Sequence, residues 1–379
     1  MNILINALAI QDSGGLRVLD KLLKECIEDK SSFYLVVCNR NENINLLIAR
    51  YKDMTNLNFK FVESKGFLHR LYYENVNFRD IVKSKKINLI YNFSGTTQIF
   101  LKTPQLLKIQ NLLFYTKKLD IVYKKNGKFI PWLKQIYFKR IVFNFMSNRA
   151  NYLEVQSSHV ENYMSDFIKT RGKTFFLKSD INVNDREFQK PKEYNFRKKI
   201  KFLYVVGPHF EYVHKNFIDF TNAMLALTKL DIDFEISITL TKKQLQESLI
   251  WNSLLNEKTN FLGYINDEEK MDKLFCDNTV LISTSVIETI GLHVIEAIKK
   301  GVLVIVPDER YSDSVYGNSI IKYELFDTKS LLNSIFSIIE DKIDINTNIV
   351  TLQSDLKSCE NKKYKSVVEI FQRIVDVQK

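Results

Sequence analysis

The amino-acid sequence predicts an α/β protein of two Rossmann-like domains, each built on a parallel sheet, that face each other across a cleft. Three observations predict this fold class. The chain has 379 residues, the length of two ordinary domains rather than one. Short apolar strand candidates alternate with amphipathic helical stretches, and these strands are apolar on both faces, as in parallel sheets covered by helices on two sides. One polar, basic stretch interrupts the alternation near mid-chain.

The alternation runs through both halves of the chain. The strand candidates are residues 2–10, 32–39, 57–64, 87–95 and 151–158 in the first half, and residues 200–207, 233–240, 259–265, 279–285 and 302–308 in the second. Residues 186–200, which include Pro191, are the best linker candidate between them. We therefore expect an N-terminal domain over 1–190 and a C-terminal domain over 196–358. Apolar residues at helical spacing near the end predict a terminal helix within 359–379. We expect this helix to pack back on the N-terminal domain.

Cysteine and histidine placement gives no sign of disulfides or of a metal site. The four cysteines have no CxxC spacing and each has apolar neighbours, so we interpret them as reduced core thiols in a reducing compartment. The five histidines show no ligand spacing with cysteine or acidic residues, so no metal and no other cofactor is expected. No stretch approaches about 18 uninterrupted apolar residues, and the chain begins with a strand candidate, so neither a transmembrane helix nor a signal peptide is expected.

The positive charge is concentrated in the first half of the chain. The formal net charge is +11; residues 1–195 carry 32 Lys and Arg against 18 Asp and Glu, whereas residues 196–379 carry 23 against 26. The first half is therefore suited to an anionic partner, which is a nucleic acid, a phosphorylated acceptor or a membrane surface.

Glycines follow the first predicted strand. Gly14 and Gly15 stand between this strand and the first predicted helix, over 15–29. Glycines at such a place permit a tight turn and close backbone approach, and the helix N-terminus offers free N–H groups to an anion or a sugar hydroxyl. The spacing is not GxGxxG, so an ordinary tight turn is an equal alternative to a binding loop.

A lysine stands where the first helix of the second domain begins. In "VVGPHFEYVHKNF" the loop after the strand ends at Lys215 and Asn216. A lysine at a helix N-terminus opposes the helix dipole unless an anion lies between them, and a diphosphate is such an anion. The alternative is a solvated surface lysine.

Two glutamates stand in the apolar stretch "ETIGLHVIEAIKKG". Glu288 falls in the predicted exit loop of a strand, Glu296 falls in the following helix, and Gly301 closes that helix. Eight residues of helix span roughly 12 Å, about the length of a nucleotide sugar. One carboxylate then accepts from sugar hydroxyls and the other from ribose hydroxyls, with the diphosphate at Gly291 and the helix N-terminus. The alternative is a capping residue and a surface residue.

This stretch resembles the ExxGLxxxEA…G signature of family 4 retaining glycosyltransferases of GT-B fold. "HKN" at 214–216 is similar to the donor-phosphate segment of that family, "FLGYINDEEKMDKLF" to its nucleotide-facing turn, and the glycine pair to its acceptor-side loop. The resemblance implies that Glu288 meets the donor sugar, Glu296 the ribose and Lys215 the diphosphate, with Glu288 and Lys215 catalytic. The donor-binding residues implied are Gly14, Gly15, Lys215, Asn216, Gly263, Tyr264, Glu288, Thr289, Ile290, Gly291, Leu292 and Glu296.

The sequence departs from the family pattern at four places. Thr284-Ser285 stands where the family has Pro-Ser, Ile290 stands where it has an aromatic residue, and His293 stands where a proline is common. The arginine that many members carry a few residues before the lysine is missing from "GPHFEYVHKN". Either Lys215 alone binds the diphosphate where the family uses two cations, or another basic residue takes the place of the arginine.

The resemblance implies a retaining hexosyltransferase that needs no metal, because the leaving diphosphate itself takes the acceptor proton. An inverting enzyme needs a base, for which Asp12 and His159 are candidates only by position. The implied activity is transfer from an NDP-sugar to a glycan or lipid-linked glycan, in bacterial O-antigen, capsule or other surface-polysaccharide synthesis. The alternatives are a non-hydrolysing sugar-nucleotide epimerase of the same fold, a nucleic-acid-binding protein, or an inactive scaffold subunit.

Residues 115–149 are basic and aromatic. They carry nine Lys and Arg against one acidic residue, interleaved with Tyr, Phe and Trp132. Such a segment rests on an anionic bilayer, binds single-stranded nucleic acid, or is a core helix with its basic residues toward water. With a lipid-linked acceptor the first alternative is favoured, and the protein is then expected in the cytoplasm, peripheral on the inner face of the cytoplasmic membrane.

Overall fold

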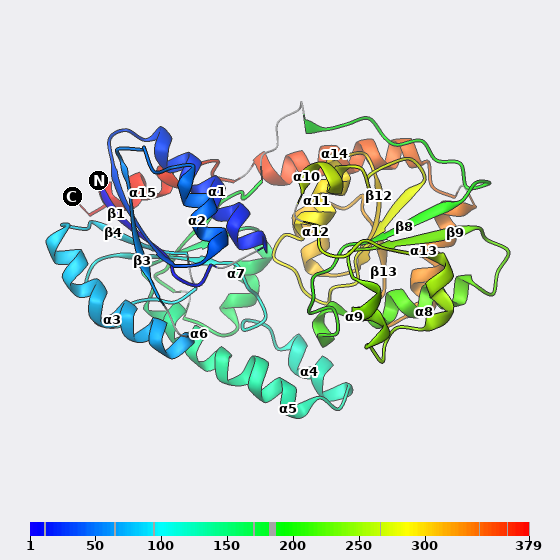
Figure 1. The fold of residues 1–379 in the computed structure, drawn as a ribbon, viewed down its shortest axis with the longest axis horizontal. Helices are drawn as coiled ribbons and strands as arrows, with labels where there is room; N and C mark the ends of the chain where they lie inside the picture. The colour runs from blue at the N-terminus through cyan, green and yellow to red at the C-terminus, as the bar shows by residue number, and fades with distance from the viewer. Residues whose placement is uncertain are drawn as a thin grey trace. The chain divides into compact units, whose positions relative to one another are not determined.

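The computed structural model divides into two compact units. The first holds Met1–Thr116, Phe129–Ile181 and Lys363–Lys379, and the second holds Lys117–Lys128 and Asn182–Lys362 (Figure 1). The structure describes residues 1–10, 13–63, 66–93, 95–169, 171–181, 187–265, 267–340, 342–361 and 363–378. Among these residues, no helix is long and apolar enough to span a bilayer.

The first unit is a parallel sheet with the strand order β3-β2-β1-β4-β5-β6-β7. Its strands are β1 (Asn2–Ala7), β2 (Phe33–Asn39), β3 (Leu57–Val62), β4 (Leu89–Asn92), β5 (Gln105–Ile109), β6 (Tyr152–Val155) and β7 (Thr174–Leu177). Its helices are α1 (Ser13–Glu28), α2 (Glu42–Ala49), α3 (Phe67–Ser84), α5 (Phe129–Trp132), η1 (Leu133–Tyr137), α6 (Phe138–Arg149), α7 (Ser158–Ser165) and α15 (Val367–Asp376). The order of strands reverses between β1 and β4, which are neighbours in the sheet.

Helices cover both faces of this sheet. On one face α1, α2 and α15 pack on β1, β2 and β4, and on the other α3 packs through Phe78 and Ile81. The terminal helix α15 buries Phe371, whose ring contacts Tyr34 and Tyr91. In Figure 1 this red helix lies beside the blue elements of the chain's beginning. The end of the chain thus completes the core of the first unit, as the sequence predicts.

The second unit is a parallel sheet with the order β10-β9-β8-β11-β12-β13. Its strands are β8 (Ile200–Tyr204), β9 (Phe234–Ile238), β10 (Thr259–Phe261), β11 (Thr279–Ile282), β12 (Leu303–Pro307) and β13 (Ile321–Tyr323). Its helices are α4 (Lys118–Lys125), η3 (Val213–Lys215), α8 (Phe217–Leu227), α9 (Lys242–Gln246), η4 (Ser253–Lys258), α10 (Glu268–Asp272), α11 (Leu292–Lys299), α12 (Arg310–Tyr316), α13 (Thr328–Ile339) and α14 (Ile345–Asn361).

The predicted fold class is confirmed: both units are Rossmann-like, with parallel sheets and helices on the two faces. Three short strands (β5, β7 and β13) are additional to the predicted ones. The predicted linker packs on the second unit, where Gln189 donates its N–H to Lys299 and Lys192 donates to Gly301. Gly301 has φ +70°, and a Cβ there would collide with the carbonyl of Lys190, so only glycine allows the linker this close.

The basic, aromatic segment 115–149 is divided between the two units. Its first part, α4, packs on the second unit and contacts η3 there, with Leu119 and Tyr123 buried. Lys118 of α4 pairs with Glu309, which begins α12. Residues 129–149 belong to the first unit. The segment is therefore divided: α4 belongs to the second unit, where it contacts η3, and residues 129–149 belong to the first.

Candidate functional site

Two loops of the second unit meet where its strand order reverses. β8 and β11 are parallel neighbours although two strands lie between them in the sequence. The carboxyl end of β8 leads to η3, and the carboxyl end of β11 leads to residues 283–291. In open parallel sheets, ligands bind at the carboxyl ends of the strands at such a reversal. Both motifs selected from the sequence lie at this point.

Lys215 and Glu288 form an ion pair at this point. The Lys215 Nζ donates to Glu288 Oε1 at 2.8 Å, and the side chains are 30% and 17% exposed. Burial alone raises the pKa of Glu288, but the positive charge of Lys215 and its hydrogen bond outweigh burial and lower the pKa to about 2. Glu288 is therefore a carboxylate near neutral pH, held in a largely buried loop rather than in an exposed one.

The backbone of Lys215 is fixed by the exit loop of β11. Thr284 Oγ1 donates to the Lys215 carbonyl at 2.9 Å, and the Tyr204 hydroxyl lies 2.7 Å from Thr284 Oγ1. The N–H of Val286 donates to the carbonyl of His214 at 2.8 Å. Thr284 replaces the proline of the resembled family, and its hydroxyl makes a bond to the lysine loop that a proline side chain cannot make.

Two histidines flank the ion pair as neutral rings. His293 stands at another departure from the family pattern. Its Nε2 lies 3.3 Å from the Ser283 hydroxyl, and burial lowers its pKa to about 4. His214 is buried, and burial and then Lys215 lower its pKa to about 4. Within the described residues, Nδ1 of His214 has no hydrogen-bond partner. The site therefore keeps its positive charge on Lys215 at neutral pH.

The N-terminus of α11 faces the same loop. Its N-cap, Gly291, is left-handed (φ 54°, ψ 64°), makes no side-chain cap bond, and is followed by a first turn without acidic residues. A Cβ at position 291 would collide with the Tyr316 hydroxyl, so the position requires glycine. The free N–H groups of such a helix start attract an anion. Lysine, carboxylate and helix N-terminus together can hold a diphosphate and an attached sugar.

The remaining predicted donor residues of the second unit spread along this sheet edge. Thr289, Ile290 and Leu292 continue the loop into α11, with Ile290 buried, and Glu296 lies partly buried in the second turn of α11. Gly263 (φ +67°) and Tyr264, 66% exposed, follow β10, two strands from β8.

Asn216 has a structural part in this loop. It is left-handed (φ 48°, ψ 41°) and buried, and its amide donates to Asp219 at 2.5 Å. Asp219 also accepts from the N–H of Phe326 at 2.9 Å and from the hydroxyl of Tyr323. Asn216 therefore shapes the turn that presents Lys215, because its amide is directed to Asp219.

The glycine pair belongs to the first unit, and its predicted loop conformation is wrong. Gly14 and Gly15 lie in the first turn of α1. At Gly15 a Cβ would lie 3.3 Å from the Ile10 side chain, so close packing accounts for that glycine. Asp12 lies outside the described residues. His159 is buried in α7, where its Nδ1 pairs with the Ser157 hydroxyl.

Comparison with known proteins finds a family match over the second unit. Residues 185–346 match the family described as Glycosyl transferases group 1. The chain therefore carries a glycosyltransferase domain. This domain spans the sheet that holds Lys215 and Glu288, and with the fold it supports a GT-B glycosyltransferase. No curated protein sequence matches the chain well enough to count as a relative.

Solved structures share the fold over the whole chain. Sucrose-phosphate synthase from Thermosynechococcus elongatus has a TM-score of 0.69 at 14% identity, with 100% of both chains covered. Anabaena HepE, solved with UDP and glucose, has 0.60 at 13%, covering 100% of this chain and 99% of its own. The lipopolysaccharide outer core galactosyltransferase WaaB has 0.60 at 14%, covering 96% and 100%. At these identities the likeness shows the GT-B fold.

The buried His214 predicts an acid-sensitive second unit. The pKa of the His214 imidazole is 6.5 in the unfolded chain and about 4 in the folded one, so between these pH values only the unfolded chain binds the proton. Stability therefore falls as the pH drops from 6.5 toward 4, by up to about 3 kcal/mol. In a Trp132→Phe background, fluorescence of Trp251, which stacks on Phe217, reports urea unfolding of this unit. We expect His214→Gln to reduce this slope, leaving the part that comes from His293, and the exposed control His69→Gln to leave it unchanged. Equal slopes in all three proteins contradict a lowered pKa of His214 in the folded protein.

Proposed function

We propose that the protein is a retaining hexosyltransferase that takes a sugar from a nucleoside-diphosphate sugar. The observation that carries this proposal is the Lys215–Glu288 pair beside the uncapped N-terminus of α11, within the glycosyltransferase group 1 match. Support for a nucleotide-sugar donor also comes from HepE, a protein of the same fold solved with UDP and glucose.

In this proposal the bound donor breaks the ion pair and becomes the new partner of both Lys215 and Glu288. Lys215 turns from Glu288 to the diphosphate, whose other charges meet the N–H groups at the start of α11. Glu288 then accepts hydrogen bonds from the sugar hydroxyls, and Glu296 from the ribose. Neither group is then left without a partner, because phosphate oxygens replace the carboxylate at Lys215 and sugar hydroxyls replace the ammonium group at Glu288.

The chemical step needs no residue as base. The bond between the anomeric carbon and the diphosphate oxygen breaks, and the acceptor oxygen bonds to the same face of that carbon. The acceptor proton passes to the departing diphosphate oxygen, so that charge and atoms balance. Lys215 and the α11 N-terminus stabilise the negative charge that develops on the leaving group. This assignment keeps the anomeric configuration.

The acceptor we propose is a glycan, lipid-linked, in the synthesis of O-antigen, capsule or another bacterial surface polysaccharide, at the inner face of the cytoplasmic membrane. WaaB, a lipopolysaccharide galactosyltransferase of the same fold, supports this assignment. A second support is a set of exposed apolar side chains on two adjacent helices of the first unit, here called the α3–α6 face. It consists of Leu68, Tyr72 and Val76 on α3 and Phe138, Ile141 and Phe145 on α6, exposed between 47% and 79%.

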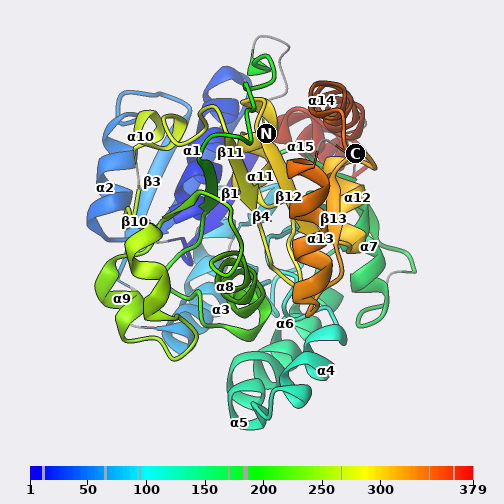
Figure 2. The ribbon, with the colours of Figure 1, turned by 90° about the vertical axis from the view of Figure 1, so that its right-hand side faces the viewer.

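The two stripes of this face lie on adjacent helices. The rings of Phe67 on α3 and Phe143 on α6 are 6.4 Å apart, and both views place these helices side by side (Figures 1 and 2). Arg79, Lys134 and Lys139 are exposed along the same helical stretches. An apolar face with basic neighbours suits an anionic bilayer surface, to which each basic residue contributes about 1 kcal/mol.

Loss of Glu288 is expected to abolish transfer. We expect purified protein, incubated with UDP-, GDP-, ADP- and CMP-sugars, to hydrolyse one donor slowly, and Glu288→Ala to lose this activity while circular dichroism shows an unchanged fold. Glu247→Ala is the control, because that carboxylate is 68% exposed in the same unit. Wild-type turnover in Glu288→Ala contradicts the assignment, and release of an epimerised nucleotide sugar indicates the epimerase instead.

Loss of Lys215 is expected to weaken binding of the nucleoside diphosphate far more than binding of the nucleoside. Only the diphosphate carries the charge that Lys215 meets, and a lost charged hydrogen bond of roughly 1.5–3 kcal/mol lowers affinity by about 10- to 100-fold. Calorimetry with UDP and uridine (or the matching pair for another base) measures this on Lys215→Ala and on the exposed control Lys242→Ala. Equal loss for both ligands points to a misfolded site.

The α3–α6 face is expected to bind anionic membranes. Co-sedimentation with vesicles should rise with phosphatidylglycerol content and fall with added salt. Changing Phe138, Ile141 and Phe145 together to serine should remove it. The matched control changes Leu249 and Leu254 to serine, two exposed leucines of the second unit. Failure to bind vesicles at low salt, or stronger binding to single-stranded oligonucleotides at matched ionic strength, overturns this prediction.

A further inference from the structure

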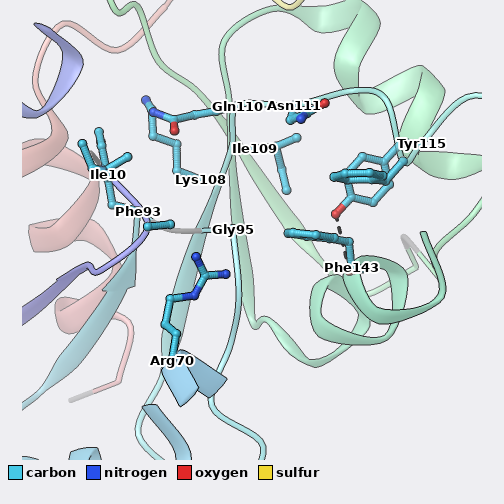
Figure 3. A pocket seen from close by; sticks show the side chains of 12 residues that line it. Ile10, Arg70, Phe93, Gly95, Lys108, Ile109, Gln110, Asn111, Tyr115 and Phe143 are labelled. Carbon is cyan, nitrogen blue, oxygen red and sulfur yellow. Dashed lines mark hydrogen bonds between the residues drawn. The ribbon is translucent and has the colours of Figure 1, made fainter. Parts of the chain in front are cut away.

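The first unit has its own pocket at the reversal of its strand order. The pocket has a volume of about 250 Å³ and lies at the carboxyl ends of β1, β4 and β5. Ile10, Phe93 and Ile109 contribute from these strand ends, and Arg70 and Phe143 from α3 and α6 (Figure 3). The reversal between β1 and β4 is the place where a parallel sheet binds a ligand.

Arg70 gives this pocket a fixed positive charge. Its side chain is 12% exposed, and its Nε lies 3.5 Å from Glu74 Oε1 without a hydrogen-bond partner among the described residues. Glu74 is fully buried and accepts from Asn6 at 3.0 Å and from Thr96 at 2.7 Å. Figure 3 shows the guanidinium pointing into the pocket. Glu74 thus anchors the arginine from behind, and the guanidinium end faces the cavity.

The second cation of the pocket is already neutralised. Lys108 is buried, and its Nζ donates to Glu154 at 2.5 Å and to Asp180 at 2.8 Å. Neither carboxylate lines this pocket, and none of the described residues that line it is acidic. An incoming anion therefore meets Arg70 without a competing carboxylate on the pocket wall.

The pocket also has an aromatic wall. Phe114 and Phe143 stack with ring centroids 4.6 Å apart and an angle of 10°. Gly95 (φ +77°) makes room for them, because a Cβ there would lie 3.2 Å from Phe143. The Tyr115 hydroxyl lies 2.5 Å from the Ser147 hydroxyl, which fixes the ring next to this wall. A rigid aromatic face suits the C–H face of a sugar ring.

We propose that this pocket binds a sugar residue that carries an anionic group, a phosphate or a carboxylate, with Arg70 as the ligand of the anion and the stacked Phe114–Phe143 pair beside the sugar ring. The volume is just below the range of about 300–1,000 Å³ of drug-sized ligands, so it suits a single ring. Gln110 and Asn111, at the upper edge in Figure 3, offer amides to hydroxyls. That this sugar is the acceptor rests on the proposed function.

Calorimetry of the full chain tests the site with four probes: glucose, glucose 6-phosphate, glucuronate and inorganic phosphate. We expect the two anionic sugars to bind at least about tenfold more tightly than glucose, and glucose 6-phosphate more tightly than phosphate alone. The comparison of glucose 6-phosphate with glucuronate separates the phosphate from the carboxylate. Equal affinity for glucose and both anionic sugars, or no binding of any probe, overturns the proposal.

Arg70→Gln is expected to remove the preference for anionic sugars, a loss of about 10- to 100-fold, and Arg70→Lys to restore part of it. The matched control is Arg40→Gln: Arg40 lies over the Phe61 ring and beside Glu63, outside the pocket, as Arg70 lies over the Phe67 ring and beside Glu74. The double variant Arg70→Gln/Glu74→Gln avoids an unpaired buried carboxylate and should show the same loss in a folded protein. An unchanged preference in either Arg70→Gln protein refutes the site.

Donor hydrolysis separates this inference from the proposed function. Arg70 belongs to the first unit and the donor machinery to the second, so Arg70→Gln should hydrolyse the donor as the wild type does. Anionic-sugar binding that depends on Arg70, in a protein without donor hydrolysis, supports the pocket and contradicts the transferase. Donor hydrolysis without such binding supports the transferase and contradicts the pocket.

Discussion

The arrangement of the second unit's site depends on pairing one lysine with one glutamate at a reversal of strand order. Lys215 and Glu288 are 73 residues apart, and they meet because β8 and β11 are parallel neighbours whose carboxyl ends share an edge. Either charge alone in this largely buried place would be unfavourable, since desolvation opposes it. Holding them together requires both loops in register. The bonds from Thr284 to the Lys215 carbonyl and from Val286 to His214 supply this.

Two of the departures from the family pattern, Thr284 and His293, lie next to that pair. Thr284 exchanges a rigid ring for a hydroxyl that binds the lysine loop, and His293 places a neutral imidazole near Glu288. In the proposed function, the missing arginine leaves Lys215 and the α11 N-terminus as the positive partners of the diphosphate. Lys118, brought to this unit by α4, pairs with Glu309. The sequence therefore differs from the family pattern in residues around the site, whereas Lys215, Glu288 and Gly291 match that pattern.

Much of this could be predicted from the sequence, and what could not depends on tertiary contacts. Long apolar strands such as β2 have a strong pattern, but β13 has three residues and β5 carries a lysine, which obscures its pattern. Lys108 is buried only because Glu154 and Asp180 come from other parts of the chain. The motifs located Lys215 and Glu288, yet neither their ion pair nor the Tyr316 hydroxyl over Gly291 follows from spacing. The attachment of α4 to the second unit likewise depends on packing.

Both units have a paired cation and carboxylate at the point where the strand order of the sheet reverses. In each, a cation stands at the reversal of strand order with a glutamate beside it: Lys215 with Glu288, and Arg70 with Glu74. The pairs differ in what surrounds the carboxylate. Glu288 shares its loop with a helix N-terminus, whereas Glu74 is fully buried and bonded to Asn6 and Thr96, so it can only anchor. A carboxylate that is fully hydrogen-bonded holds its cation in one position, which suits the recognition of a bound anion. In the proposed function, a carboxylate that can release its cation suits a leaving group that binds and departs in each turnover.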